Sequence, residues 1–176
     1  MKITKITNTF FLLILIISMN VIGFSNSKKI QKFLNTNKNW FQILNGGDLC
    51  VSSPEKSGNK ITQQLCAKAD NLLWRIVKDG DFSYLVSKNG FSLNNLGGIK
   101  VEGHNIFGTE FNKDNSEEWI IKKIENLKDK VQIINVITKM CLSSEGYVQV
   151  NSIHKLRNCN KHNLNQLFEI KPIKFE

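Results

Sequence analysis

Three similar stretches decide the fold of this chain: ADNLLWRIV (residues 69–77), NSEEWIIKK (115–123) and NLNQLFEIK (163–171). Each places an aromatic residue directly before a short apolar run, with a polar residue three positions earlier. The aromatic residues are Trp74, Trp119 and Phe168. The stretches recur at a period of about 45 residues, and self-similarity at a fixed period of this size indicates a chain built from repeated structural units.

Each repeat also opens in a matched way, with an alternating apolar run, a polar turn and a second short apolar run. The three openings are FQILNGGDLCV from Phe41, YLVSKNGFSLN from Tyr84 and VQIINVITKMCL from Val131. Alternation with period two, interrupted by turn residues such as Gly46-Gly47 and Asn89-Gly90, predicts short antiparallel strands. We therefore expect one all-β domain over residues 40–173, preceded by a basic polar linker over residues 26–39.

In the first and third repeats, a cysteine lies at nearly the same distance before the closing aromatic residue. Cys66 lies eight positions before Trp74, and Cys159 lies nine positions before Phe168. In the middle repeat, the position eight residues before the tryptophan holds Phe111. The middle repeat has therefore lost this cysteine.

The first and third repeats each have a second, earlier cysteine, and the middle repeat lacks this one as well. Cys50 and Cys141 have Ser92 as their counterpart in the middle repeat. Joint loss of both cysteines is what a disulfide bridge within each repeat predicts. Four cysteines allow three connectivities, and this pattern favours Cys50–Cys66 with Cys141–Cys159.

The N-terminus reads as an export signal. Two lysines precede an unbroken apolar run over residues 10–17, and small or polar residues then lead to a cleavage point after Gly23 or Ser25. We predict a signal peptide over residues 1–25, an uncleaved anchor being the alternative. The protein is then secreted or extracellular, with no transmembrane segment after signal cleavage, and oxidised cysteines agree with that compartment.

The repeats resemble the ricin B-chain lectin family, whose members close each repeat with an Asn-Gln-x-Trp motif. The motif reads Asn71-Leu72-x-Trp74 in the first repeat, Ser116-Glu117-x-Trp119 in the second and Asn165-Gln166-x-Phe168 in the third. The resemblance implies a β-trefoil with pseudo-threefold symmetry. It also implies that Trp74, Trp119 and Phe168 are core residues.

Sugar binding in that family depends on an Asp two residues after the first Cys, an aromatic residue two before the second Cys, and the Asn-Gln pair. A carboxylate accepts hydrogen bonds from adjacent sugar hydroxyls, and an aromatic face stacks on the apolar side of the sugar ring. No repeat here keeps the full set. The Asp positions hold Ser52, Asn94 and Ser143, and the aromatic positions hold Gln64, Thr109 and Arg157.

Matching the family's positions to this chain suggests two remodelled sugar sites. The second repeat offers Asn94 with Phe107, near His104. The third repeat offers a larger set, namely Ser143, Asn165 and Gln166, flanked by Lys155 and Arg157. A hydroxyl is a weaker acceptor than a carboxylate, so we expect charge to compensate and an acidic, sulfated or sialylated glycan to bind in a salt-sensitive way.

Metal, nucleic-acid and catalytic functions find little support in the sequence. A zinc site at Cys159 with His154 and His162 is the alternative to a bridge, but no C-x-x-C pair accompanies these residues. The net charge of +9 comes mostly from lysine, without interleaved arginine and aromatic residues, so nucleic acid is not expected. Glu117 and Glu118 are adjacent in an expected strand, where neighbours point to opposite faces, so they cannot act as an acid/base pair.

Two classes of function remain, and neither is an enzyme or needs a cofactor or a metal. The first is a secreted, carbohydrate-binding protein that resembles ricin B-type lectins and recognises glycans or glycoproteins through remodelled sites. The alternative is a non-catalytic structural or adaptor protein, such as a wall component or a toxin-type delivery subunit. Its trefoil would then be a scaffold that binds a protein partner.

Overall fold

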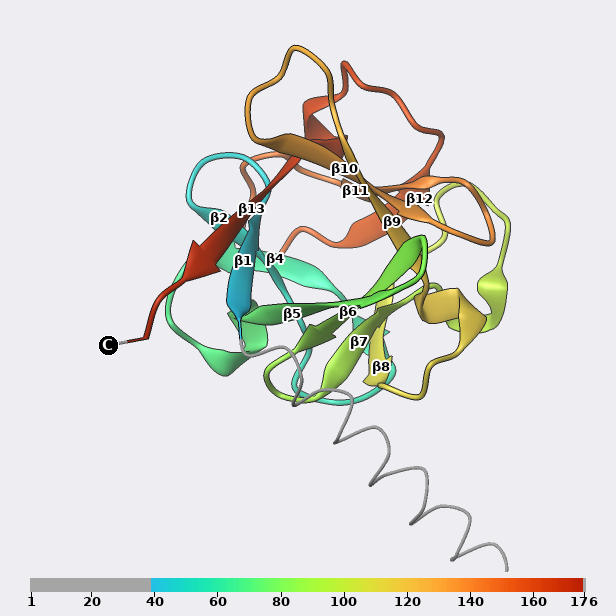
Figure 1. Ribbon diagram of the computed structural model, residues 1–176, viewed down its shortest axis with the longest axis horizontal. Coiled ribbons are helices and arrows are strands. Elements are labelled where there is room, and N and C mark those ends of the chain that lie inside the picture. The colour runs from blue at the N-terminus through green and yellow to red at the C-terminus, as the bar shows by residue number, and fades with distance from the viewer. Residues whose placement is uncertain (1–38, 176) are drawn as a thin grey trace, which may run out of the picture. The chain divides into compact units, whose positions relative to one another are not determined.

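A computed structural model describes residues 39–175 of the chain (Figure 1). The predicted signal peptide (residues 1–25) and all but the last residue of the predicted linker (26–39) lie outside the described residues. Within residues 39–175, no helix has the length and apolar character needed to cross a membrane.

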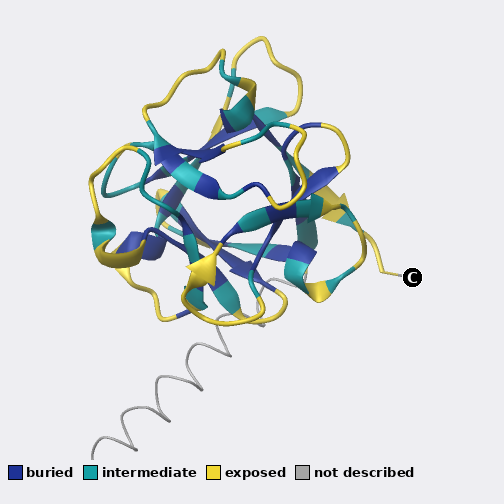
Figure 2. Cartoon of the chain, turned by 180° about the vertical axis from the view of Figure 1, so that it is seen from behind, coloured by how far each residue is buried: buried dark blue, intermediate teal, exposed yellow. Residues whose placement is uncertain are grey.

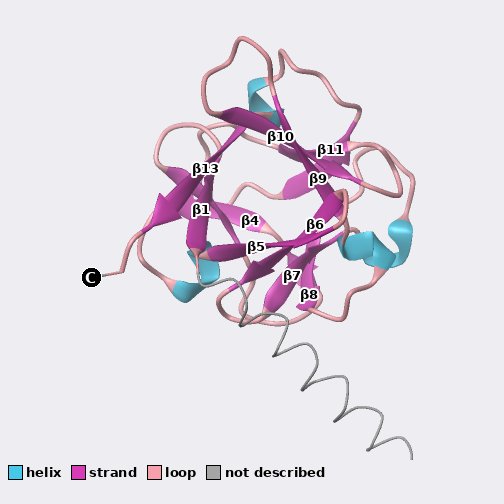
Figure 3. Ribbon diagram, viewed as in Figure 1, coloured by secondary structure: helices cyan, strands magenta, loops and turns pink. Residues whose placement is uncertain are grey.

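The described chain consists of short strands joined by turns and four single-turn 3-10 helices (Figure 3). The first repeat holds β1 (Trp40–Leu44), β2 (Leu49–Ser52), β3 (Asn59–Lys60), β4 (Thr62–Leu65), η1 (Asp70–Leu72) and β5 (Trp74–Asp79). The second holds β6 (Phe82–Ser87), β7 (Phe91–Asn94), η2 (Leu96–Gly98), β8 (Phe107–Glu110), η3 (Asn115–Glu117) and β9 (Trp119–Lys123). The third holds β10 (Lys130–Asn135), β11 (Cys141–Ser144), β12 (His154–Arg157), η4 (Leu164–Gln166) and β13 (Phe168–Ile173).

Six strands, two from each repeat, close into a ring around the centre of the domain (Figure 1). In order they are β1, β5, β6, β9, β10 and β13, and β13 pairs again with β1. Each repeat adds one further hairpin: β2 with β4, β7 with β8, and β11 with β12. This all-β, pseudo-threefold arrangement is the β-trefoil that the sequence predicts.

The strand register confirms how the repeats align with one another. Cys50 is opposite Gln64, Ser92 is opposite Thr109, and Cys141 is opposite Arg157. The three pairs therefore occupy equivalent positions in three equivalent hairpins. A position in one repeat can be compared directly with its counterparts in the other two.

The three closing aromatic residues lie in the core. Trp74, Trp119 and Phe168 have no exposed surface. The Trp74 indole donates to the Val51 carbonyl (2.8 Å), and the Trp119 indole donates to the equivalent Leu93 carbonyl (2.8 Å). A buried indole N–H without a partner would be costly, so these bonds fix both rings. Figure 2 shows buried residues along the strands and exposed ones mostly in the loops.

Both disulfides have the predicted pairing, Cys50–Cys66 and Cys141–Cys159, and they account for all four cysteines. The middle repeat replaces the bridge with non-covalent contacts. The Ser92 hydroxyl donates a hydrogen bond to the buried Glu117 carboxylate, and the Phe111 ring packs edge-on against Tyr84, with centroids 5.2 Å apart. Polar and aromatic packing thus occupies the space that a disulfide fills in the other repeats.

The expected strand at Glu117 and Glu118 is wrong, because Glu117 ends the 3-10 helix η3 and Glu118 caps it. The cause is a capping box, in which Asp114 accepts from the Ser116 N–H and Glu117 accepts from the Asp114 N–H. Burial raises the pKa of Glu117, although its hydrogen bonds, led by that from Ser92, oppose the rise. Glu117 therefore has a structural role in tying the loop before β9.

Three equivalent residues, Ile61, Ile106 and His154, meet around the pseudo-threefold axis and are fully buried. Their backbones form a cycle of hydrogen bonds. The Ile61 N–H donates to the Ile106 carbonyl (2.8 Å), the Ile106 N–H to the His154 carbonyl (2.9 Å), and the His154 N–H to the Ile61 carbonyl (3.0 Å). Neither ring nitrogen of His154 has a hydrogen-bond partner among residues 39–175. Burial lowers the pKa of His154 to about 4, so the ring is neutral at pH 7.

Candidate functional site

In the first repeat, the position where the resemblance predicts a sugar site is occupied by side chains that form hydrogen bonds within the protein. The Asn71 amide donates to the Ser52 hydroxyl (3.0 Å). The Gln64 amide donates to the Asn151 side chain (2.5 Å), which comes from a loop of the third repeat. These residues brace the hairpin against its neighbours and leave few polar atoms for a ligand.

The second repeat has an open pocket of about 750 Å³ at the equivalent place. Asn94 lines it, but its amide donates to the Thr109 hydroxyl (2.7 Å) and its carbonyl accepts from the Ser116 hydroxyl (2.7 Å). Asp114 brings a carboxylate to the pocket, and hydrogen bonds from the Ser116 N–H and hydroxyl hold the pKa of Asp114 below its usual value. The pocket is polar, with no aromatic residue among those that line it within the described chain.

Phe107, predicted to act with Asn94 near His104, lies close to both of these residues. Phe107 is cross-strand from Asn94, yet it is not among the residues that line the pocket. Its ring lies against His104, with centroids 5.8 Å apart. The two aromatic groups thus pack on each other.

The third repeat has a pocket of about 500 Å³, which we call the Glu145 pocket. Four of the predicted site residues line it, namely Ser143, Arg157, Asn165 and Gln166. The other residues that line it include Glu102, Glu145, Asn158, Asn160 and Asn163. The structure thus brings most of the predicted third-repeat site together and adds amides and carboxylates that the prediction omitted.

Two of the predicted ligand contacts in this pocket are used internally. Gln166 is 1% exposed; its amide donates to the Asn158 carbonyl (2.9 Å) and its side-chain oxygen accepts from the Asn160 N–H (2.7 Å). Ser143 is 2% exposed, and its hydroxyl donates to the Ser144 carbonyl (3.3 Å). Gln166 holds the loop after β12, and both side chains are buried and bonded to the protein itself.

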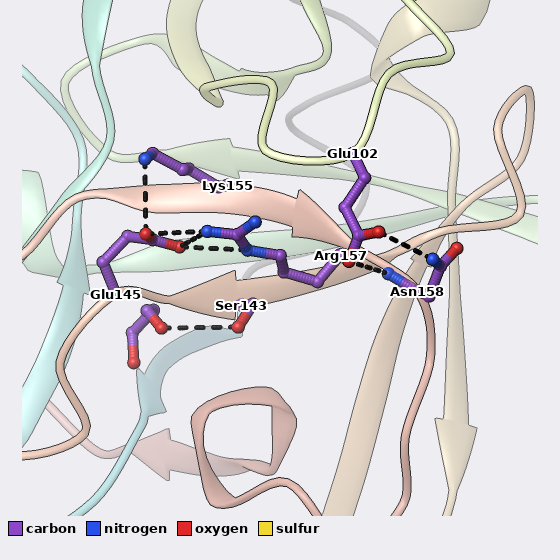
Figure 4. A network of polar contacts seen from close by, with 7 residues as sticks. Glu102, Ser143, Glu145, Lys155, Arg157 and Asn158 are labelled. Atoms are coloured by element: carbon purple, nitrogen blue, oxygen red, sulfur yellow. Dashed lines mark hydrogen bonds and ion pairs between the residues drawn. The ribbon is translucent and has the colours of Figure 1, made fainter.

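Lys155 and Arg157 share one carboxylate partner, Glu145, which was not among the predicted site residues (Figure 4). Arg157 Nη2 lies 2.9 Å from both carboxylate oxygens of Glu145, and Lys155 Nζ lies 3.2 Å from one of them. Glu102 also lines the pocket, so two carboxylates face these two basic groups and the pocket has little net positive charge. The available signal was an acidic residue two positions after Ser143, where the hairpin strand has just ended.

A loop from the second repeat completes the wall of the Glu145 pocket. The Glu102 carboxylate accepts from the Asn158 amide (2.7 Å) and from the Asn158 N–H (3.3 Å), as Figure 4 shows. The contact joins residues 56 positions apart in the sequence. This wall fixes the Asn158 side chain at the rim of the pocket.

The chain resembles solved β-trefoil structures at low sequence identity. It covers 97% of the designed threefold-symmetric protein ThreeFoil with 75% of its own length (TM-score 0.69, 13% identity). The Macrolepiota procera ricin B-like lectin, solved in complex with lactose, is covered to 94% by 75% of the chain (TM-score 0.65, 18% identity). The fold is the β-trefoil of these structures. No protein-family model and no curated protein sequence matches the chain.

The same trefoil also occurs as part of a larger enzyme. The chain resembles 31% of an exo-β-1,3-galactanase from Clostridium thermocellum, using 78% of its own length (TM-score 0.70, 13% identity). The fold of this chain thus resembles both a lectin and part of a glycosidase chain. At these identities the comparisons define the fold, and the site residues must define the function.

Proposed function

We propose that the protein is a secreted glycan-binding protein whose main sugar site is the Glu145 pocket. The observation that carries the proposal is the Glu145 carboxylate, held by Arg157 and Lys155 in a pocket otherwise lined largely by amides. Glu145 replaces the carboxylate that Ser143 cannot supply. The pocket lies on the β11–β12 hairpin, where the resemblance to ricin B-type lectins locates a sugar site.

The chemistry of the pocket suits adjacent sugar hydroxyls. A carboxylate is an acceptor for hydroxyl donors, and a charged acceptor forms stronger hydrogen bonds than a neutral one. The side chains of Asn158, Asn163 and Asn165 can donate and accept, which matches the dual character of a hydroxyl. The planar Arg157 guanidinium occupies the position of the family's stacking ring, so affinity rests on hydrogen bonds more than on stacking.

Export and the absence of catalysis belong to the same proposal. Two intramolecular disulfides are typical of secreted proteins, in agreement with the signal peptide predicted for residues 1–25. Glycosidases generally use a pair of carboxyl groups that flank the sugar bond. Here Glu145 is engaged by Arg157 and Lys155, and Glu102 by Asn158, which supports a binding role for both carboxylates.

A glycan array with the disulfide-bonded protein tests the proposal. We expect a hit that Glu145→Gln weakens roughly 10-fold or more, because the variant loses the charged acceptor and frees Arg157. Glu110→Gln is the matched control, since Glu110 is exposed on β8 outside both pockets. An array without any hit would overturn the lectin proposal and support a protein-binding adaptor. Hits that Glu145→Gln leaves intact would place the site elsewhere.

A further inference from the structure

Most basic residues of the described domain lie outside the Glu145 pocket. Residues 39–175 contain 18 basic and 14 acidic residues. Five of the basic residues form ion pairs, and two of these five pair with Glu145. The basic residues able to attract an anionic ligand are therefore those without a carboxylate partner.

Three such lysines, Lys122, Lys123 and Lys161, line one pocket of about 370 Å³, which we call the lysine pocket. None of the three forms an ion pair with a carboxylate of residues 39–175. Glu125 is the single acidic residue among the described residues that line it, so the pocket has a positive balance. Its remaining lining is partly amide, from Asn126 and Gln132.

The lysine pocket adjoins the Glu145 pocket. Cys159 lines both, so the chain from Asn158 to Lys161 forms the wall between them. Gln132, in the lysine pocket, donates to the side-chain oxygen of Gln166, in the Glu145 pocket (3.4 Å). The disulfide to Cys141 anchors this wall to β11. The two pockets are thus built on one braced element, close enough for neighbouring parts of a single glycan.

We propose that the lysine pocket binds an anionic substituent, a sulfate ester or a carboxylate, of a glycan whose neutral part occupies the Glu145 pocket. This inference rests on the proposed function. Lysine ammonium groups bind sulfate and carboxylate oxygens through charge-assisted hydrogen bonds. The sequence predicts that Lys155 and Arg157 bind the anion. The ion pairs of Glu145 move that role to Lys122, Lys123 and Lys161.

The test compares N-acetyllactosamine with its 3′-sulfated and 3′-sialylated forms by calorimetric titration. We expect the better of the two anionic forms to bind about 10-fold more tightly than the neutral sugar at low salt, and the advantage to shrink as ionic strength rises. The double variant Lys122→Gln/Lys161→Gln should abolish the advantage without changing affinity for the neutral sugar. Lys56→Gln/Lys171→Gln, which removes two exposed lysines outside both pockets, should preserve it.

The outcomes separate this inference from the proposed function. Suppose that the neutral sugar binds in a Glu145-dependent way but neither anionic form binds more tightly. The lysine pocket is then not an anion site, and the lectin function stands. The same conclusion follows if the tighter binding of an anionic form persists in the Lys122/Lys161 variant. If none of the three sugars binds and the glycan array has no hit, both proposals fail. A sulfate-only gain identifies a sulfated ligand, and a gain with the sialylated form alone identifies a carboxylate.

Discussion

Replacing His154 with isoleucine should make the fold less sensitive to acid. Its two pseudo-equivalents, Ile61 and Ile106, already carry isoleucine at the same buried position on the axis. Burial lowers the pKa of His154 from its ordinary value of 6.5 to about 4, and the weaker effects of the Ile61 backbone contact and of Glu145 oppose this change. The pKa difference corresponds to roughly 3 kcal/mol in the free energy of unfolding.

The sign follows from which state holds the proton. Between pH 6.5 and about 4, the unfolded chain protonates this histidine and the folded chain does not. Stability from this residue is therefore complete above pH 6.5, falls as the pH drops, and stops falling below about pH 4. His154→Ile lacks this dependence, and it also removes two buried nitrogens that have no partner among the described residues.

Denaturant unfolding at pH 7, 6, 5 and 4, with the disulfides intact, measures the effect. We expect the variant to be at least as stable as the natural protein at pH 7, and its advantage to grow by roughly 3 kcal/mol on going to pH 4. Because both proteins share every other titrating group, the difference isolates His154. His162→Gln, at an exposed histidine, should show no such trend. A stability difference that stays constant from pH 7 to 4 would refute the reasoning.

Two further predictions concern the bridges and the middle repeat. Replacing Cys141 and Cys159 with alanine should lower the free energy of unfolding by about 3 kcal/mol, because their bridge closes a loop of 18 residues; denaturant titration measures this, and an unchanged midpoint would contradict it. Glu117→Gln should be stabilising at pH 8 and less so at pH 4, because burial raises the pKa of Glu117 and the folded state therefore disfavours its ionised form at high pH. A gain in stability that is larger at pH 4 than at pH 8 would reverse this sign.

The features predictable from sequence are those that depend on a constant spacing between equivalent residues of the repeats. Trp74, Trp119 and Phe168 share an offset from the cysteine positions, and the structure buries all three. The same register applies to His154. His154 lies five residues before Cys159, as Ile61 lies five before Cys66, so its burial on the axis could have been inferred.

The features that sequence could not supply depend on loop conformation. Gln166 is the residue that the family has at this motif position. Whether its amide contacts a ligand or the backbone depends on the path of residues 158–163. Glu145 is separated from Arg157 by 12 residues, and only the β11–β12 hairpin brings the two together. The Glu102 contact joins two repeats across 56 residues. Polar partners of this kind follow from the folded geometry and leave no periodic pattern.

The most direct test of the central claim is a nuclear magnetic resonance titration of the isotope-labelled protein with the best glycan from the array. The side-chain amides of Asn158, Asn163 and Asn165 and the Arg157 Nε–H report on the Glu145 pocket, and each can be observed separately. A glycan bound in this pocket predicts that these signals shift together in the natural protein, and that a roughly 10-fold higher glycan concentration or more is needed for the same shifts in Glu145→Gln. Signals that stay fixed while the glycan binds, or shifts confined to the first and second repeats, would contradict the account.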